Sequence, residues 1–430
     1  MYRTTIQDLY RWKQKADRKP LIIRGARQVG KTWLMKTFGA EAYKSTVYIN
    51  FDNNNSIKQL FTGGFDIRRI IMGLELHAGF NITKNTLLIF DEVQETPEAL
   101  TALKYFNEEA PEYHIICAGS LLGVALHGGT SFPVGKVEFL DMYPLSFIEF
   151  LQAMGREKFA ELIMACDFAM LSAFREVLID LLKQYYYIGG MPEVVSDFSQ
   201  GRDFNRAREI QERILIAYEQ DFSKHAPLEI VPRIRLLWNS IPAQLTKENK
   251  KFIYGVIKEG ARAKEYELAL MWLADCGLVH KIHRATAPRL PLKAYEDVKA
   301  FKLFMLDVGL LSCMVRLRQN ILLDGNDLFR EFKGALTEQF VLQQLATLKI
   351  PTYYWTNDRN SAEIDFLMDT GDTAVPMEVK AETNLQAKSL RVFRQKFNPK
   401  TAVRASMADY SVVEGLVNLP LYALNSISDL

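Results

Sequence analysis

The N-terminal third alternates short apolar runs with segments of helical periodicity. Apolar runs without polar alternation suit strands that are covered on both faces. Residues 32–38 and 96–109 instead follow helical repeats, and Thr96 and Pro97 provide a helix start. The pattern predicts an α/β fold with a parallel sheet. The expected strands are 20–24, 45–51, 87–90, 115–118 and 137–140.

The loop after the first expected strand fits the pattern G-x-x-x-x-G-K-[ST]. In such a loop, backbone N–H groups and the N-terminus of the next helix attract phosphate. Lys31 is expected to reach the β- and γ-phosphates of ATP or GTP, and the hydroxyl of Thr32 is expected to bind Mg²⁺. The predicted nucleotide-binding residues are Gly25, Ala26, Arg27, Gln28, Val29, Gly30, Lys31, Thr32 and Trp33.

A second motif ends the expected strand at 87–90 with two carboxylates, Asp91 and Glu92. We expect Asp91 to hold the Mg²⁺ ion with its water shell, and Glu92 to polarise an attacking water. Hydrolysis requires both roles, so the acidic pair favours an ATPase over a nucleotide kinase. Ser120 follows the strand at 115–118. It is a candidate catalytic residue that senses the γ-phosphate, and capping of the next helix is an equally good reading.

Composition and charge predict a cytoplasmic protein. The chain has 430 residues, enough for two to four domains, and a formal net charge of +2. No apolar run approaches the ~20 residues of a membrane span, so no membrane contact is expected. The four cysteines are far apart and form no C-x-x-C motif, which indicates reduced thiols.

The basic residues are concentrated in the middle of the chain. Residues 229–310 hold 14 Lys or Arg against 9 Asp or Glu. Expected helices at 247–258 and from Ala263, followed by an alternating strand at 278–283, resemble a winged helix. Contact with DNA phosphates and simple packing against the ATPase core are both open. The candidate phosphate contacts are Lys250, Lys251, Lys258, Arg262 and Lys264.

After residue 320 the pattern changes again. A helix is expected at 332–345, and strands are expected at 353–355, 362–367 and 375–380. Side chains two residues apart on a strand share a face, so Glu378 and Lys380 point the same way and Asp365 can meet them. Two carboxylates and a lysine can bind Mg²⁺ and activate water against a phosphodiester. The candidate metal ligands here are Glu338, Asp365 and Glu378. The candidate catalytic residues are Asp365, Glu378 and Lys380.

Nine segments, in order along the chain, resemble a widespread prokaryotic family of uncharacterised AAA-type P-loop ATPases with a C-terminal domain of unknown function. They are GARQVGKT, TLLIFDEVQ, ICAGSLLG, YPLSFIEFL, GGMPEVV, IPAQLTKENKKF, LPLKAYED, FKLFMLDVGLL and AEIDFL with PMEVKAE. The resemblance implies an AAA-type core, then a winged helix, then a fold like the PD-(D/E)XK restriction endonucleases. Relatives tend to have Gly-Arg where this chain has Gly135-Lys136. Lysine lacks the planar fork of arginine, so a finger role for Lys136 is not expected.

Together these features predict an ATP-binding and ATP-hydrolysing protein whose nucleotide state controls a DNA-binding, nuclease-like C-terminal half. The alternative is a nucleotide-gated switch whose C-terminal half only binds protein or nucleic acid. The expected cofactors are ATP and Mg²⁺, and the expected partners are DNA and a second copy of the chain or another protein. The expected domains are 1–200 (ATPase), 201–320 (helical and winged helix) and 326–430 (endonuclease-like).

Overall fold

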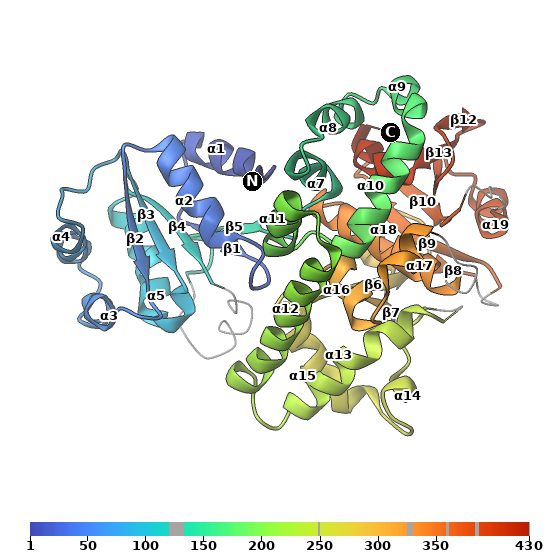
Figure 1. Cartoon of the computed structure of the whole chain (residues 1–430). Helices are drawn as coiled ribbons and strands as arrows, with labels where there is room; N and C mark the ends of the chain where they lie inside the picture. The colour runs from blue at the N-terminus through green and yellow to red at the C-terminus, as the bar shows by residue number, and fades with distance from the viewer. Residues whose placement is uncertain (120–132, 248–249, 325–329, 358–360, 383–386, 430) are drawn as a thin grey trace. The chain divides into compact units, whose positions relative to one another are not determined.

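The computed structural model describes residues 1–119, 133–247, 250–324, 330–357, 361–382 and 387–429 (Figure 1). Contacts divide the chain into two compact units. The smaller unit contains Arg3–Tyr143 with Asp275–Gly277, and the larger unit contains Pro144–Ala274 and Leu278–Leu430 with the first two residues. These units do not follow the ranges 1–200, 201–320 and 326–430, which remain a prediction about domains.

The smaller unit is built on one parallel sheet, as the sequence predicted, and its strand order is β2-β3-β4-β1-β5. Its strands are β1 (Leu21–Arg24), β2 (Ser45–Asn50), β3 (Thr86–Asp91), β4 (His114–Ala118) and β5 (Glu138–Asp141). Its helices are α1 (Ile6–Gln14), α2 (Lys31–Ala42), α3 (Asn55–Thr62), α4 (Ile67–Ala78) and α5 (Pro97–Glu109).

Both faces of this sheet are covered, which explains the uninterrupted apolar runs. Gly39 of α2 approaches Leu87 on one face. Leu88 and Phe90 of β3 point to the opposite face. They belong to the apolar core formed with α3, α4 and α5. All six residues of β3 are buried. Because successive side chains of a strand point to opposite faces, a strand between two helical layers needs apolar residues at every position.

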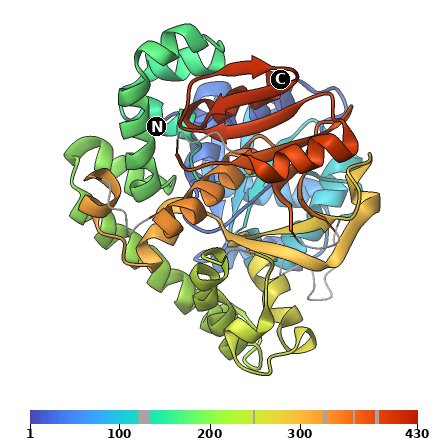
Figure 2. The same cartoon turned by 90° about the vertical axis from the view of Figure 1, so that its right-hand side faces the viewer.

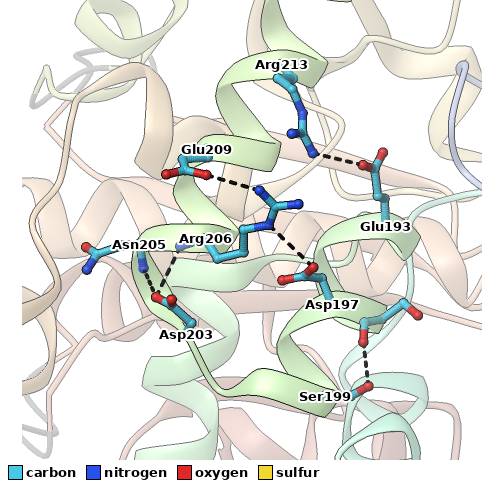
Figure 3. Close-up of polar contacts among 9 residues, drawn as sticks. Glu193, Asp197, Ser199, Asp203, Asn205, Arg206, Glu209 and Arg213 are labelled. Atoms are coloured by element: carbon cyan, nitrogen blue, oxygen red, sulfur yellow. Dashed lines mark hydrogen bonds and ion pairs between the residues drawn. The ribbon is translucent and has the colours of Figure 1, made fainter.

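The larger unit contains helices and one sheet, and its first part, α7 to α15, is helical. Its helices are α7 (Phe147–Ala153), α8 (Glu157–Met164), α9 (Phe168–Ala173), α10 (Arg175–Ile188), α11 (Pro192–Gly201), α12 (Phe204–His225), α13 (Val231–Leu245), α14 (Tyr254–Ile257), α15 (Ala263–Asp275), α16 (Val308–Met314), α17 (Gln319–Asp324), α18 (Arg330–Thr347) and α19 (Lys388–Phe397). Ion pairs join α11 to α12: Arg206 contacts Asp197 (3.6 Å) and Arg213 contacts Glu193 (3.2 Å), as Figure 3 shows. These pairs are exposed, so each contributes little stability.

An eight-stranded mixed sheet forms the rest of the larger unit, with order β12-β13-β11-β10-β9-β8-β6-β7. The strands are β6 (Val279–Ala285), β7 (Glu296–Met305), β8 (Thr352–Thr356), β9 (Glu363–Asp369), β10 (Ala374–Val379), β11 (Ala402–Ser406), β12 (Ser411–Val413) and β13 (Leu416–Pro420). The helix and strands expected after residue 330 are confirmed. Figure 2 shows α19 lying along the C-terminal strands, and its Leu390 and Phe393 pack in one core with Trp355.

Three segments that are distant in sequence meet at two glycines of the larger unit. Leu145 donates its backbone N–H to the carbonyl of Gly190 (2.7 Å). Asp307 is fully buried and accepts the N–H of Gly190 (2.6 Å). A Cβ at Gly190 would lie 2.2 Å from the carbonyl oxygen of Leu145, and one at Gly189 would lie 2.2 Å from Asp307 Oδ1. This close approach explains why the sequence has two glycines here.

The helix expected at 247–258 is wrong. Among the described residues of that range, only Tyr254–Ile257 is helical. The N–H of Phe252 donates to the carbonyl of Phe301 on β7 (2.7 Å), and that of Ile253 donates to the side chain of Gln244 (3.1 Å). These backbone groups pair with distant partners, so they are not used in a local helix. The helix from Ala263 and the strand at 278–283 are confirmed as α15 and β6. No helix among the described residues is long and apolar enough to cross a membrane.

Candidate functional site

The loop between β1 and α2 has the backbone of an anion-binding turn. Gly25, Gln28 and Gly30 all have positive φ, at 142°, 65° and 95°. A Cβ at Gly25 would lie 2.2 Å from the carbonyl oxygen of Met142, so only glycine fits there. Gly30 is the N-cap of α2 in the left-handed conformation. The loop thus leads directly into a helix N-terminus, which favours bound phosphate.

Lys31 lies over this loop. Its side chain is buried, and Nζ donates to the carbonyl oxygens of Gly25 (2.8 Å) and Ala26 (2.7 Å). Burial lowers the pKa of Lys31 to about 8, although the carboxylates of Glu92 and Asp91 oppose that shift. The ammonium therefore remains mostly protonated at neutral pH, where it can pair with phosphate oxygens.

Asp91 joins the loop helix to the end of β3. Its Oδ2 accepts the hydroxyl of Thr32 (2.6 Å) and that of Tyr48 (3.0 Å), and it is 4% exposed. A hydroxyl and a carboxylate side by side are hard oxygen donors, which suit Mg²⁺ bound through one or two protein groups together with phosphates. The pair expected to hold Mg²⁺ is thus brought together. The sequence motifs did not indicate a role for Tyr48 at this site. Its pKa is raised to about 12, first by burial and then by Asp91.

Glu92 follows in an unusual backbone conformation, with φ 50° and ψ 45°. A non-glycine residue rarely adopts this left-handed conformation, and such strain concentrates at functional sites. The amide of Gln94 donates to Oε2 of Glu92 (2.6 Å) and orients the carboxylate. Gln94 lies in the same TLLIFDEVQ segment, yet its role was not predicted.

Arg3 is a second residue that the sequence did not reveal. Its guanidinium is buried and donates to the carbonyl oxygens of Val29 (3.1 Å) and Tyr143 (2.5 Å). One side chain thereby connects the chain start, the loop and the segment after β5. No local pattern marks an arginine near the N-terminus as a loop support.

Three further residues of the predicted ATPase domain have separate positions. Trp33 is 43% exposed on α2. Lys136 forms a partly exposed ion pair with Glu108 (2.9 Å). Ser120, the expected γ-phosphate sensor, lies outside the described residues.

In the larger unit, β9 and β10 bring the expected C-terminal residues close together. Oδ2 of Asp365 accepts the backbone N–H of Val379 (2.8 Å). Glu378 is buried, and its Oε1 lies 2.7 Å from Nζ of Lys380. Its Oε2 accepts the N–H of Leu390 at the start of α19 (3.0 Å). The expected proximity of Asp365, Glu378 and Lys380 is therefore present.

Two more lysines, which were not expected here, neutralise acids beside this group. Lys250 forms an ion pair with Glu338 of α18, with both side chains nearly buried. Lys302 of β7 is fully buried and pairs with Glu363. Lys250 thus faces an acid inside the fold, and the prediction that it contacts DNA phosphate does not agree with this position.

Electrostatics in this cluster are strongly coupled. Burial first, and then the charge of Glu338, raise the pKa of Asp365 to about 7, although Lys302 and Lys250 oppose the shift. Burial also raises the pKa of Glu338, but the nearby lysines outweigh it and hold the pKa below its ordinary value. Within the described part of the chain, no three His, Cys, Asp or Glu side chains are grouped to hold a metal ion. Glu338, Asp365 and Glu378, the predicted metal ligands, are therefore not grouped as a metal site in this structure. Their carboxylates have lysine or backbone partners instead.

Comparison with protein families agrees with the site in the smaller unit. Residues 17–151 match the family model of an AAA domain. Residues 179–320 and 333–424 match two models that are each described as a domain of unknown function, DUF8612 and DUF4143. The parallel sheet, the phosphate loop and the first match define a P-loop domain of the AAA type. The chain joins this domain to a C-terminal DUF4143 domain.

Several solved structures are similar to the chain at low identity. A Walker-type ATPase of Pyrococcus abyssi is 15% identical, with a TM-score of 0.47 over 72% of this chain and 94% of that one. The ORC2 protein of Aeropyrum pernix in ADPNP–ADP complexes is 14% identical, with a TM-score of 0.36 over 73% and 94%. The ORC1 protein of Aeropyrum pernix in complex with DNA is 13% identical, with a TM-score of 0.29 over 74% and 93%. Among curated proteins, none matches the chain.

Proposed function

We propose that this protein is a Mg²⁺-dependent ATPase whose nucleotide state controls a DNA-binding C-terminal half. The observation that carries the ATPase proposal is the convergence of the loop and the acidic pair in one fold. Thr32 and Asp91 are 59 residues apart and share a hydrogen bond of 2.6 Å, with Lys31 and Glu92 beside them. The AAA-domain match over the same residues supports it.

Each of these side chains has one role in the proposal. Lys31 would pair with the β- and γ-phosphates, and the loop N–H groups would hold them in place. Thr32 and Asp91 would hold Mg²⁺, which neutralises charge that develops on the phosphates. Glu92, oriented by Gln94, would position the attacking water and accept its proton.

The test separates binding from turnover in the full-length protein. Lys31→Ala should abolish ATP binding, because it removes the charge that the phosphates require. Glu92→Gln should keep ATP affinity and lose steady-state hydrolysis, because only the proton acceptor is lost. Glu95→Gln is the matched control, since Glu95 is an exposed acid three residues on. Hydrolysis at the wild-type rate in Glu92→Gln would show that the assignment is wrong.

The proposed DNA-binding region is the winged-helix-like segment from Lys251 through α14 and α15 to β6. Support comes from four cations that are exposed there: Lys251, Lys258, Arg262 and Lys264. If they contact phosphates, each loss should weaken DNA binding for all sequences alike and lower its salt dependence by about one counterion. ATP hydrolysis measured with and without double-stranded DNA tests the link to nucleotide. Binding that is unchanged in the quadruple alanine variant would leave this region as packing alone.

For the C-terminal half, we propose a fold like the PD-(D/E)XK nucleases. The order of α18, β9 and β10, and the proximity of Asp365, Glu378 and Lys380, support this proposal. Asp365, Glu378 and Glu338 would then hold a divalent cation, and Lys380 would stabilise developing charge at a phosphodiester. The residues carry hard carboxylate oxygens, although in their present positions each has a lysine or backbone partner.

One observation favours the second candidate, a nucleotide-gated module that binds but does not cut. The acids pair with lysines, as Glu338 does with Lys250 and Glu378 with Lys380. Calorimetry with Mn²⁺ on the full-length protein and on Asp365→Ala distinguishes the two. Binding that Asp365→Ala removes supports the metal site. Identical titrations for the two proteins would favour the binding module.

The proposal also covers the association and the location of the protein. Association with a second copy of the chain or with another protein is proposed because ATPases of this type commonly act in assemblies. A cytoplasmic location is proposed because the four cysteines, all within the described residues, form no disulfide and three of them are buried, as in a reducing compartment.

A further inference from the structure

A polar pocket of the larger unit lies between α19 and the C-terminal strands. Its volume is about 360 Å³. Three arginines converge on it: Arg391 and Arg394 from α19, and Arg404 from β11. Gln395 and Asn398 add polar groups to its wall. Three guanidinium groups on one pocket make a positive surface of the kind that binds anions.

Among the described residues, the charges of Arg391 and Arg394 are poorly compensated. Within the described residues, neither Arg391 nor Arg394 forms an ion pair with a carboxylate; Arg394 donates to the backbone carbonyl of Glu414 (2.5 Å). Arg404 donates its Nε to the amide oxygen of Asn418 (3.2 Å). Amide and carbonyl oxygens orient guanidinium groups without neutralising them. The guanidinium of Arg391 and the other donors of Arg394 can therefore reach a ligand.

The sequence of α19 strengthens this argument. Residues 388–400 contain five cations and no acid. Arg391 and Arg394 are three residues apart, so they are neighbours on the helix surface and repel each other. A helix that keeps like charges together, with no acid to relieve them, is stabilised when an anion binds between them.

The pocket also borders the acidic residues of the C-terminal half. Arg404 on β11 is directly opposite Glu378 on β10 in the strand register. Leu390, another lining residue, donates its N–H to Glu378 (3.0 Å). A group held by the three arginines would therefore lie one strand away from Glu378 and two strands away from Asp365.

We propose that this pocket binds phosphates of a nucleic-acid backbone and holds the strand beside Asp365 and Glu378. Planar guanidinium forks bind phosphate through two parallel hydrogen bonds, and arginine is the preferred residue for this contact. The inference rests on the proposed function, because it specifies how the C-terminal half grips nucleic acid. It adds a contact surface separate from the exposed cations of the winged-helix-like segment.

The test measures binding of a labelled 20-base-pair DNA duplex by the full-length protein at several salt concentrations. Arg391→Gln and Arg394→Gln should each weaken binding about fivefold to tenfold and lower the salt slope by about one. Arg391→Lys should recover part of the affinity. The matched control is Lys400→Gln, an exposed cation on the same segment outside the pocket, which should change affinity less than twofold. ATP hydrolysis without DNA should be unchanged in the arginine variants.

The outcomes separate this inference from the proposed function. If the wild type binds DNA and the double variant Arg391→Gln/Arg394→Gln binds with the same affinity and salt slope, the pocket assignment is wrong and DNA binding stands. If the wild type binds no DNA, the proposed function fails and this inference fails with it. Titration with inorganic phosphate identifies the source of the ligand. Phosphate that raises the melting temperature of the wild type but not of Arg391→Gln, and that competes with DNA only at millimolar concentration, supports a backbone site. Competition at micromolar concentration would instead indicate a site for free phosphate.

Discussion

Lys302 provides a sharp test of the buried charges in the larger unit. Its side chain is fully buried on β7, pairs with Glu363 and lies 5.0 Å from the ring centre of Tyr354. Burial alone would lower the pKa of Lys302, but the carboxylates of Glu363, Glu338 and Asp365 together raise it above the ordinary value. The lysine is therefore charged, and it compensates three acids at once.

Lys302→Met keeps the volume of the side chain and removes its charge. Removing one partner of a buried ion pair costs about 3–5 kcal/mol. Glu363 is 23% exposed, so water can hydrate it in part, which puts the expected loss near the lower end, at about 3 kcal/mol. The loss should be smaller at pH 6 than at pH 8, because Asp365, with its pKa near 7, takes up a proton and relieves the unbalanced negative charge.

Hydrogen exchange suits this measurement because it reports local opening, and a chain with two compact units does not have to unfold in a single step. A loss of about 3 kcal/mol corresponds to faster exchange of β9 and β10 amides by a factor of about 100 at pH 8, after correction for intrinsic rates. Lys299→Met is the control, since Lys299 is exposed on the same strand. Adding Glu363→Gln should restore part of the protection. A change below about 1 kcal/mol, or one of equal size at both pH values, would refute the argument.

Two further predictions concern the smaller unit. Arg3→Ala removes the hydrogen bonds of its guanidinium to Val29 and Tyr143 and should destabilise the unit by about 2–4 kcal/mol and weaken ATP binding. Unchanged melting and ATP affinity would contradict this. Burial, with Arg18 and Lys13, lowers the pKa of His114 to about 4. The neutral ring therefore contributes to folding stability above pH ~6.5, and this contribution is lost as the pH falls towards 4. Because the ring is half exposed, the expected loss of folding free energy is about 1 kcal/mol, which is less than the full pKa shift would give. His114→Asn should melt with a weaker dependence on pH in this range, and an equally steep dependence would show that another group is responsible.

The sequence by itself determined the parts of the protein that depend on local order. Five parallel strands, the phosphate loop and the acidic pair were predicted because each is a short pattern whose residues act together. A strand covered on both faces needs a continuous apolar run, and a loop with positive φ needs glycine at Gly25 and Gly30. Asp365, Glu378 and Lys380 were found for the same reason, since β9 and β10 are adjacent strands.

Only the tertiary structure decided which distant residues complete these sites. Arg3 reaches Tyr143 across 140 residues, and Lys250 reaches Glu338 across 88. The helix expected at 247–258 failed because the N–H of Phe252 pairs with Phe301 on β7, and that of Ile253 pairs with the side chain of Gln244 on α13. The physical reason is the same in each case. Charges and hydrogen-bond groups act over a few ångströms in space, and the fold alone determines which residues come within that distance.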